Sequence, residues 1–216
     1  LEKQPFDVVL SELRMDKVDG MQILRRCREN HPDTEVILVT GSNTTEAHPV
    51  IGLEIKAAVK KNGAALIVAD PREIDLVRYA RVWLRQRSGT DVALFNGMMQ
   101  VILAENLANK EFIAKRTEDF EKFQAVVRQY TPERVQAITG VDPEKLRQAA
   151  RLYAGAATAS IVYSMGITQH TTGTDNVLST ANLAMLTGQI GKPSSGVKPP
   201  MPNMMRSPFS RELTRT

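Results

Sequence analysis

Short runs of consecutive apolar residues alternate along the chain with stretches whose apolar residues recur at helical spacing. The runs Val36–Val39, Ala64–Ala69, Val82–Leu84 and Ile161–Tyr163 are each bounded by polar or glycine-containing segments, which is typical of strands buried on both faces of a parallel sheet. Between the first two runs, segment 50–63 spaces its apolar residues three or four positions apart. The order of these elements predicts an α/β fold, a Rossmann-like parallel sheet flanked by helices.

Local signals mark where the helices begin and end. Gly63 is a C-cap signal for the first helix after Val36–Val39. Thr90 or Asp91 is expected to cap the helix that follows Val82–Leu84. Further helices are expected in the charged stretch 109–155 and over 175–191.

The two ends of the chain differ from this central part. We expect a strand over 6–13, then a helix over 18–30 that contains Cys27. From Lys192 onward the chain is rich in Pro, Ser, Met and Arg and shows neither helical nor strand periodicity, which predicts an irregular tail.

Composition and charge argue against several classes of protein, namely those that bind nucleic acid, span a membrane or bind a metal through side chains alone. The net charge of +4 comes from 28 basic and 24 acidic residues scattered without a block of one sign, so a nucleic-acid partner is not expected. The N-terminal sequence lacks a signal-peptide pattern and no apolar run is long enough for a membrane span, so we expect a cytoplasmic protein. Cys27 is the only cysteine and the three histidines are far apart in sequence, so we expect no metal site made by protein side chains alone.

The segment "GSNTTEAHP" draws attention because it directly follows an apolar run. Small and polar residues between a buried strand and a helix are typical of a ligand-holding loop at the carboxyl end of a parallel sheet. Gly41, Ser42 and Asn43 offer close backbone approach and N–H groups at a helix N-terminus, which suits a pyrophosphate.

Four stretches in order, "GSNTTEAHPVIG", "LIVADPR", "RSGTDVALFNGM" and the part from "YSMGITQHTTGTDNV" to "ANLAMLTGQIGKP", carry a family resemblance. From about residue 43 to 197 the chain resembles the α (catalytic) subunit of formate dehydrogenases, in the molybdopterin oxidoreductase superfamily. The family reaction is two-electron oxidation of formate to CO₂. The resemblance implies one half of a bis(molybdopterin guanine dinucleotide) cofactor, which would bring molybdenum or tungsten.

The resemblance, with the chemistry of the loops, implies a set of cofactor-binding residues. Asp70 and Arg72 would address a ribose hydroxyl and a phosphate, and Asp91 would accept hydrogen bonds from the N1–H and N2 amino edge of guanine. By resemblance, Met165, Gly166 and Gln169 would approach the pterin, with His170 and Thr171 behind them. The full set is Gly41, Ser42, Asn43, Glu46, His48, Asp70, Arg72, Gly89, Asp91, Met165, Gly166 and Gln169.

Structural roles compete with these assignments. Asp70 and Asp91 are also suited to capping turns, and Gly166 to making one. The family's cysteine or selenocysteine metal ligand and its cysteine-bound iron–sulfur cluster have no counterpart here, since Cys27 matches neither motif. We therefore expect no catalytic residue and no metal ligand in this chain, which alone would be inactive and would need other formate dehydrogenase subunits or fragments.

Residues 5–41 resemble something different, the middle of a response-regulator receiver domain. Glu12 would align with its phosphoacceptor aspartate and Thr40 with its switch hydroxyl. The expected organisation is thus a receiver-like segment 1–41, a cofactor-binding domain 42–197 and a tail 198–216. The leading hypothesis is a fragment or fusion product related to the formate dehydrogenase catalytic subunit that retains the molybdopterin guanine dinucleotide-binding region. The alternatives are a non-enzymatic response-regulator-like signalling or interaction module and a rearrangement product without selected function.

Overall fold

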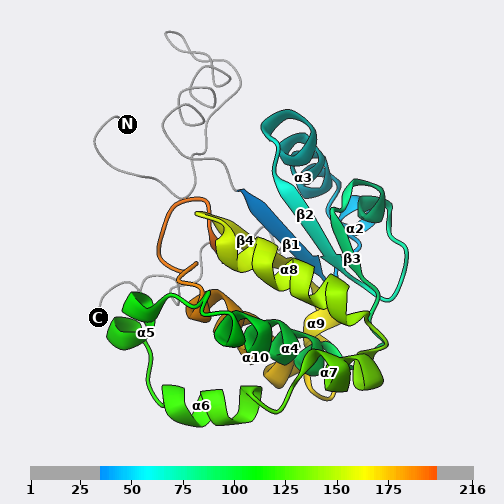
Figure 1. Ribbon diagram of the computed structural model, residues 1–216. Coiled ribbons are helices and arrows are strands. Elements are labelled where there is room, and N and C mark those ends of the chain that lie inside the picture. The colour runs from blue at the N-terminus through cyan, green and yellow to red at the C-terminus, as the bar shows by residue number, and fades with distance from the viewer. Residues whose placement is uncertain (1–34, 199–216) are drawn as a thin grey trace, which may run out of the picture.

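A five-stranded parallel sheet forms the centre of the computed structural model, which describes residues 35–198 (Figure 1). The order of strands across the sheet is β3-β2-β1-β4-β5. The strands are β1 (Val36–Thr40), β2 (Ala65–Ala69), β3 (Val82–Leu84), β4 (Ala159–Tyr163) and β5 (Gly196–Lys198). The predicted α/β fold with a parallel sheet and flanking helices is confirmed.

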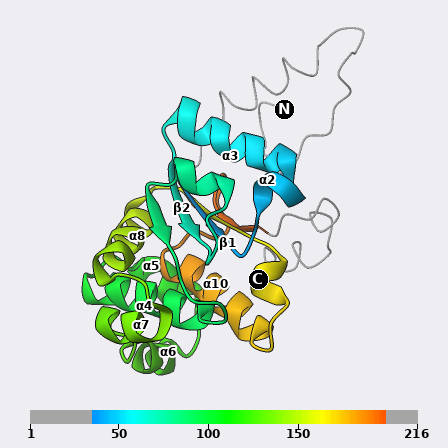
Figure 2. The ribbon, with the colours of Figure 1, turned by 90° about the vertical axis from the view of Figure 1, so that its right-hand side faces the viewer.

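Helices cover both faces of the sheet (Figures 1 and 2). One face carries α3, and the other carries α8 with α4 and α10 beyond it. The helices are α2 (Thr44–Ala47), α3 (Pro49–Asn62), the 3₁₀-helix η1 (Asp75–Tyr79), α4 (Asp91–Ala104), α5 (Lys110–Arg116), α6 (Phe120–Val127), α7 (Pro132–Thr139), α8 (Pro143–Gly155), α9 (Met165–Thr168) and α10 (Gly173–Leu186).

The central position of β1 in the sheet explains why its sequence is apolar up to its last residue. β1 pairs with β2 on one side and β4 on the other, each over all five of its residues. Leu38 belongs to the apolar cluster on the α4–α8 face, whereas Ile37 and Val39 belong to the cluster on the α3 face. A strand covered on both faces needs an uninterrupted apolar run.

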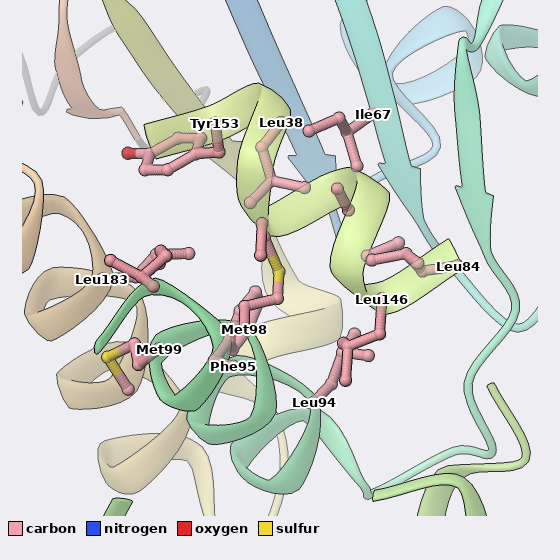
Figure 3. Packing of buried hydrophobic residues seen from close by; sticks show 14 of the residues in the cluster. Leu38, Ile67, Leu84, Leu94, Phe95, Met98, Met99, Leu146, Tyr153 and Leu183 are labelled. Atoms are coloured by element: carbon pink, nitrogen blue, oxygen red, sulfur yellow. The ribbon is translucent and has the colours of Figure 1, made fainter. Parts of the chain in front are cut away.

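The larger core lies between the sheet and α4, α8 and α10. Leu94, Phe95 and Met98 of α4 are fully buried, and Figure 3 shows them beside Leu146 of α8. α4 also packs closely on α7, because a Cβ at Gly97 would lie 2.6 Å from the Cγ2 of Val135. Glycine at this point lets the two helices approach each other.

Capping residues divide the charged stretch 109–155 into four helices. Asn109, Thr131 and Asp142 accept hydrogen bonds from backbone N–H groups in the first turns of α5, α7 and α8. Gly63 ends α3 in the left-handed conformation, with φ of 75°, as the sequence predicts.

The structure corrects two expectations. Thr90 stands at the N-cap position of α4, but its hydroxyl donates to the Arg87 carbonyl at 2.6 Å instead of capping the helix. The stretch from Lys192 is not wholly irregular, because Gly196–Lys198 form β5, which pairs with β4. The expected strand 6–13, the helix 18–30 and the rest of the tail lie outside the described residues.

Candidate functional site

A cleft of about 340 Å³ lies at the carboxyl ends of four neighbouring strands. The chain runs from β1 outward to β2 and β3, and then returns to place β4 on the other side of β1. The direction of winding thus reverses between β1 and β4, where ligands of open α/β sheets bind. The lining residues are Gly41, Ser42, Asn43, Ala47, Asp70, Pro71, Arg72, Gln86, Ser88, Gly89, Asp91, Ser164, Met165, Gly166 and His170.

Most of the residues proposed from the sequence meet in this cleft. The structure brings together Gly41, Ser42, Asn43, Asp70, Arg72, Gly89, Asp91, Met165 and Gly166. Glu46 on α2, His48 at the junction of α2 and α3, and Gln169 at the end of α9 do not line it. A larger, open hollow of about 450 Å³ is lined only by residues of α8 itself, so it brings no separate elements together.

Two glycines form the crossing of the β1 and β4 loops. The N–H of Gly166 donates to the carbonyl of Gly41 at 3.0 Å. A Cβ at Gly166 would lie 2.6 Å from that carbonyl oxygen, and a Cβ at Gly41 would lie 2.7 Å from the Gly166 carbonyl carbon. Gly41 also has a φ of 55°, so it needs glycine for conformation as well as for space.

The loop after β1 is held by its own side chains. The buried Ser42 places its hydroxyl oxygen 3.0 Å from that of Thr44. The side-chain carbonyl of Asn43 accepts from the Thr45 hydroxyl at 3.2 Å. The side chains of Ser42 and Asn43 therefore shape the loop, in addition to any ligand contact.

Asp70 is a buried carboxylate at the end of β2. Its Oδ1 accepts from the backbone N–H of Arg72 at 2.8 Å, and its carbonyl accepts from the Trp83 indole N–H at 2.9 Å. Burial raises the pKa of Asp70; the Arg72 N–H and guanidinium oppose the rise, and the charge of Asp91 adds to it. Asp70 therefore does stabilise the turn after β2, as the competing structural role predicts. It also lines the cleft together with the carboxylate of Asp91, and its second oxygen is not used in the turn.

Asp91 and Gln86 form a buried pair at the β3 end of the cleft. They are 5% and 2% exposed, and the Gln86 Nε2 donates to Asp91 Oδ1 at 3.0 Å. Gln86 Oε1 is buried and has no hydrogen-bond partner among residues 35–198. The Asp91 side chain therefore bonds to Gln86 rather than capping α4.

Gln86 was missed from the sequence because it stands between Arg85 and Arg87 in a polar loop. A signal was available: Gln86 stands two residues after Leu84 and four after Val82, so it continues their alternation, and all three side chains are buried. Ser88 was missed as well, and nothing in its sequence context distinguishes it from a solvated loop residue.

Among residues 35–198, no three His, Cys, Asp or Glu side chains gather into a group that could hold a metal ion. No helix between these bounds is both long and apolar enough to cross a membrane.

Comparison with known proteins decides the family. The model of the molybdopterin oxidoreductase family matches residues 18–202. The chain belongs to this family. Membership implies a molybdopterin cofactor with molybdenum or tungsten, and the cleft of this molybdopterin oxidoreductase fits such a group, since it offers glycine backbone, an exposed arginine and buried hydrogen-bond acceptors.

The relatives include formate dehydrogenases. Formate dehydrogenase H of Escherichia coli (strain K12) is 46% identical over 167 residues, which are 77% of this chain and 23% of that protein. The F420-dependent formate dehydrogenase subunit alpha of Methanocaldococcus jannaschii is 48% identical over 165 residues, 76% of this chain and 24% of that protein. The solved structure of acetylene hydratase from Pelobacter acetylenicus is 33% identical, with a TM-score of 0.68 over 72% of this chain and 22% of its own.

These matches bear on the segment that resembles a receiver domain. The family match begins at residue 18 and so crosses the expected boundary after residue 41. Strand β1, the last part of that segment, is the centre of the molybdopterin oxidoreductase sheet. Neither the family match nor these relatives support a response-regulator segment or the signalling alternative. The chain spans about a quarter of the length of its formate dehydrogenase relatives.

Proposed function

We propose that this chain forms the region of a formate dehydrogenase catalytic subunit that binds one molybdopterin guanine dinucleotide. The observation that carries the proposal is the cleft itself, which runs along four adjacent strand ends in the order β3, β2, β1, β4. An elongated ligand lying along this edge would meet different chemical groups at each strand, as a dinucleotide requires.

The base belongs at the β3 end in this proposal. The carboxylate of Asp91 accepts from both N1–H and the N2 amino group of guanine, whereas adenine presents an acceptor at N1. Burial of Asp91 strengthens this discrimination, because a mismatched base would leave the carboxylate without partners in a poorly solvated site.

The middle of the cleft suits the sugar and phosphates. Asp70 has a second carboxylate oxygen to accept from a ribose hydroxyl while its Oδ1 holds the Arg72 N–H. The Arg72 side chain is 72% exposed and lies at the cleft, where it can pair with a phosphate. The crossing of Gly41 and Gly166 leaves no side chain between a pyrophosphate and the backbone.

The pterin end lies at the β4 loop. Met165, 51% exposed, and Gly166 line it, with His170 behind them. When bound, the cofactor would supply the metal at which formate gives up two electrons. In this proposal the residues of this chain bind and orient the cofactor. We place the remaining cofactor ligands and the electron-transfer groups in other parts or other subunits of the enzyme, because the Methanocaldococcus jannaschii relative is named as a subunit alpha.

Three measurements on the purified 216-residue chain test this function. Molybdenum and tungsten are determined by elemental mass spectrometry, and pterin is determined by fluorescence of the denatured supernatant; about one equivalent of cofactor supports the proposal. The nucleotide end is tested separately by calorimetric titration with GDP and ADP, and we expect GDP to bind at least about 10-fold more tightly, as loss of a charge-assisted hydrogen bond implies. Absence of cofactor together with equal binding of GDP and ADP would contradict the proposal.

A further inference from the structure

Gln86 places an unused hydrogen-bond acceptor inside the cleft. Its side chain lies 2% exposed beside Asp91, and the two residues line the same end of the cleft. A buried amide oxygen without a partner is unfavourable and uncommon in a folded protein. A ligand that donates a hydrogen bond to this oxygen would supply the missing partner.

The orientation of the Gln86 amide follows from its neighbour. The Gln86 Nε2 amino group donates to Asp91 Oδ1 at 3.0 Å, because of the two Gln86 amide atoms only the nitrogen can donate. The Oε1 oxygen is then directed away from that contact, and it has no partner in the described part of the chain. Gln86 therefore lines the cleft beside Asp91 with an acceptor oxygen that has no protein partner among residues 35–198.

We propose that Gln86 is a specificity-determining residue that accepts a hydrogen bond from the exocyclic amino group of guanine. This inference rests on the proposed function. The N2 amino group of guanine carries two hydrogens, and Asp91 uses one of them together with N1–H. The second hydrogen remains for an acceptor on a residue that lines the same end of the cleft, and the unpartnered Oε1 of Gln86 meets this requirement. In this arrangement Gln86 accepts a hydrogen bond from the amino group, and Asp91 accepts from both N1–H and the amino group.

The test compares GDP with inosine diphosphate, whose base keeps N1–H and lacks the amino group. Titrations of the full chain use wild type, Gln86→Leu and Gln86→Lys, with Gln136→Leu on the exposed side of α7 as a matched control. Lysine at this position still donates to Asp91 but cannot accept, so it separates the acceptor role from the positioning of Asp91.

We expect both Gln86 variants to bind GDP about 3- to 10-fold more weakly, the effect of one neutral hydrogen bond, while binding of inosine diphosphate stays unchanged. Equal weakening of both nucleotides by Gln86→Leu would show that Gln86 only positions Asp91, and would overturn the inference. Unchanged GDP binding by Gln86→Lys would overturn it too. If wild type does not prefer GDP over ADP, the proposed function fails and this inference with it. If wild type prefers GDP over inosine diphosphate and the Gln86 variants retain that preference undiminished, the Gln86 assignment alone is refuted.

Folding of the variants is checked by thermal unfolding. Gln86→Leu removes a buried polar group that has an unpartnered oxygen, so we expect its unfolding midpoint to stay close to wild type. If Gln86→Leu does not fold, the Gln86→Lys titration carries the same comparison of the two nucleotides.

Discussion

The α4–α8 core and the cleft are both buried, but they bury different groups. The core gathers side chains such as Leu94, Phe95 and Leu146, whose burial is favourable without any directional partner. The cleft buries Asp70, Gln86 and Asp91, which need partners of defined geometry. The difference teaches that the core stabilises the fold mainly without directional partners, while the cleft holds polar groups that depend on them, one of which, Gln86 Oε1, has no partner among residues 35–198.

The two regions are separated by only a few residues. Leu84 ends β3 inside the core, and Gln86 follows it in the cleft. Asp91 begins α4 in the cleft, and Leu94 enters the core within the first turn. Substitutions on the two sides of this boundary should therefore separate stability from ligand binding.

The largest effect on stability is expected in the core. Phe95→Ala should lower the free energy of unfolding by about 3–5 kcal/mol, because it removes a large, fully buried side chain and leaves a cavity. Urea denaturation measures the change, with Leu178→Ala, 54% exposed on α10, as the control. A similar small loss in both variants would contradict the assignment of Phe95 to the core.

Gly166→Ala should be the most damaging change in the cleft. The added methyl group would meet the backbone of Gly41 at 2.6 Å, so we expect a loss of about 2–4 kcal/mol in unfolding free energy together with loss of GDP binding. Gly155→Ala at the end of α8 has nothing within 4 Å of its Cβ and serves as control in the same unfolding and titration experiments. Equal stability of the two variants would show that the loops do not need this close approach.

Asp91→Asn should affect binding far more than folding. It removes the charge and turns one acceptor into a donor, so GDP affinity should fall about 10- to 100-fold while unfolding free energy changes by less than about 1 kcal/mol. Calorimetric titration and urea denaturation of the same preparation check the two parts. GDP binding equal to that of wild type would exclude Asp91 as the base-recognition residue.

Asp70→Asn should produce the smallest change in stability, and the size of this change depends on pH. Burial raises the pKa of Asp70 in the folded chain, so the charged form is unfavourable there and the neutral asparagine variant should be at least as stable at pH 7. As the pH falls through the raised pKa, wild-type Asp70 takes up a proton and the advantage of the variant should shrink. Unfolding curves at pH 7 and pH 4 measure this difference, and a wider gap at pH 4 would contradict it.

The sequence predicted more of the fold than of the cleft. The alternation of strands and helices, the C-cap at Gly63 and the burial of β1 follow from local pattern. Residues after strand ends, such as Asp70 and Asp91, were also placed at the cleft, because the carboxyl ends of parallel strands share one edge. Whether these residues bind the cofactor stays a prediction.

What the sequence alone determined about this protein is the α/β class, its main strands and its resemblance to formate dehydrogenase α subunits. Tertiary structure decided that Gly196–Lys198 pair with β4, that Gly41 meets Gly166, and that Gln86 is buried against Asp91. The reason is physical: turn signals and hydrophobic periods act between residues close in sequence, whereas the first two contacts depend on which distant segments the open sheet brings together. The burial of the Gln86–Asp91 pair, although local in sequence, depends on the packing around it.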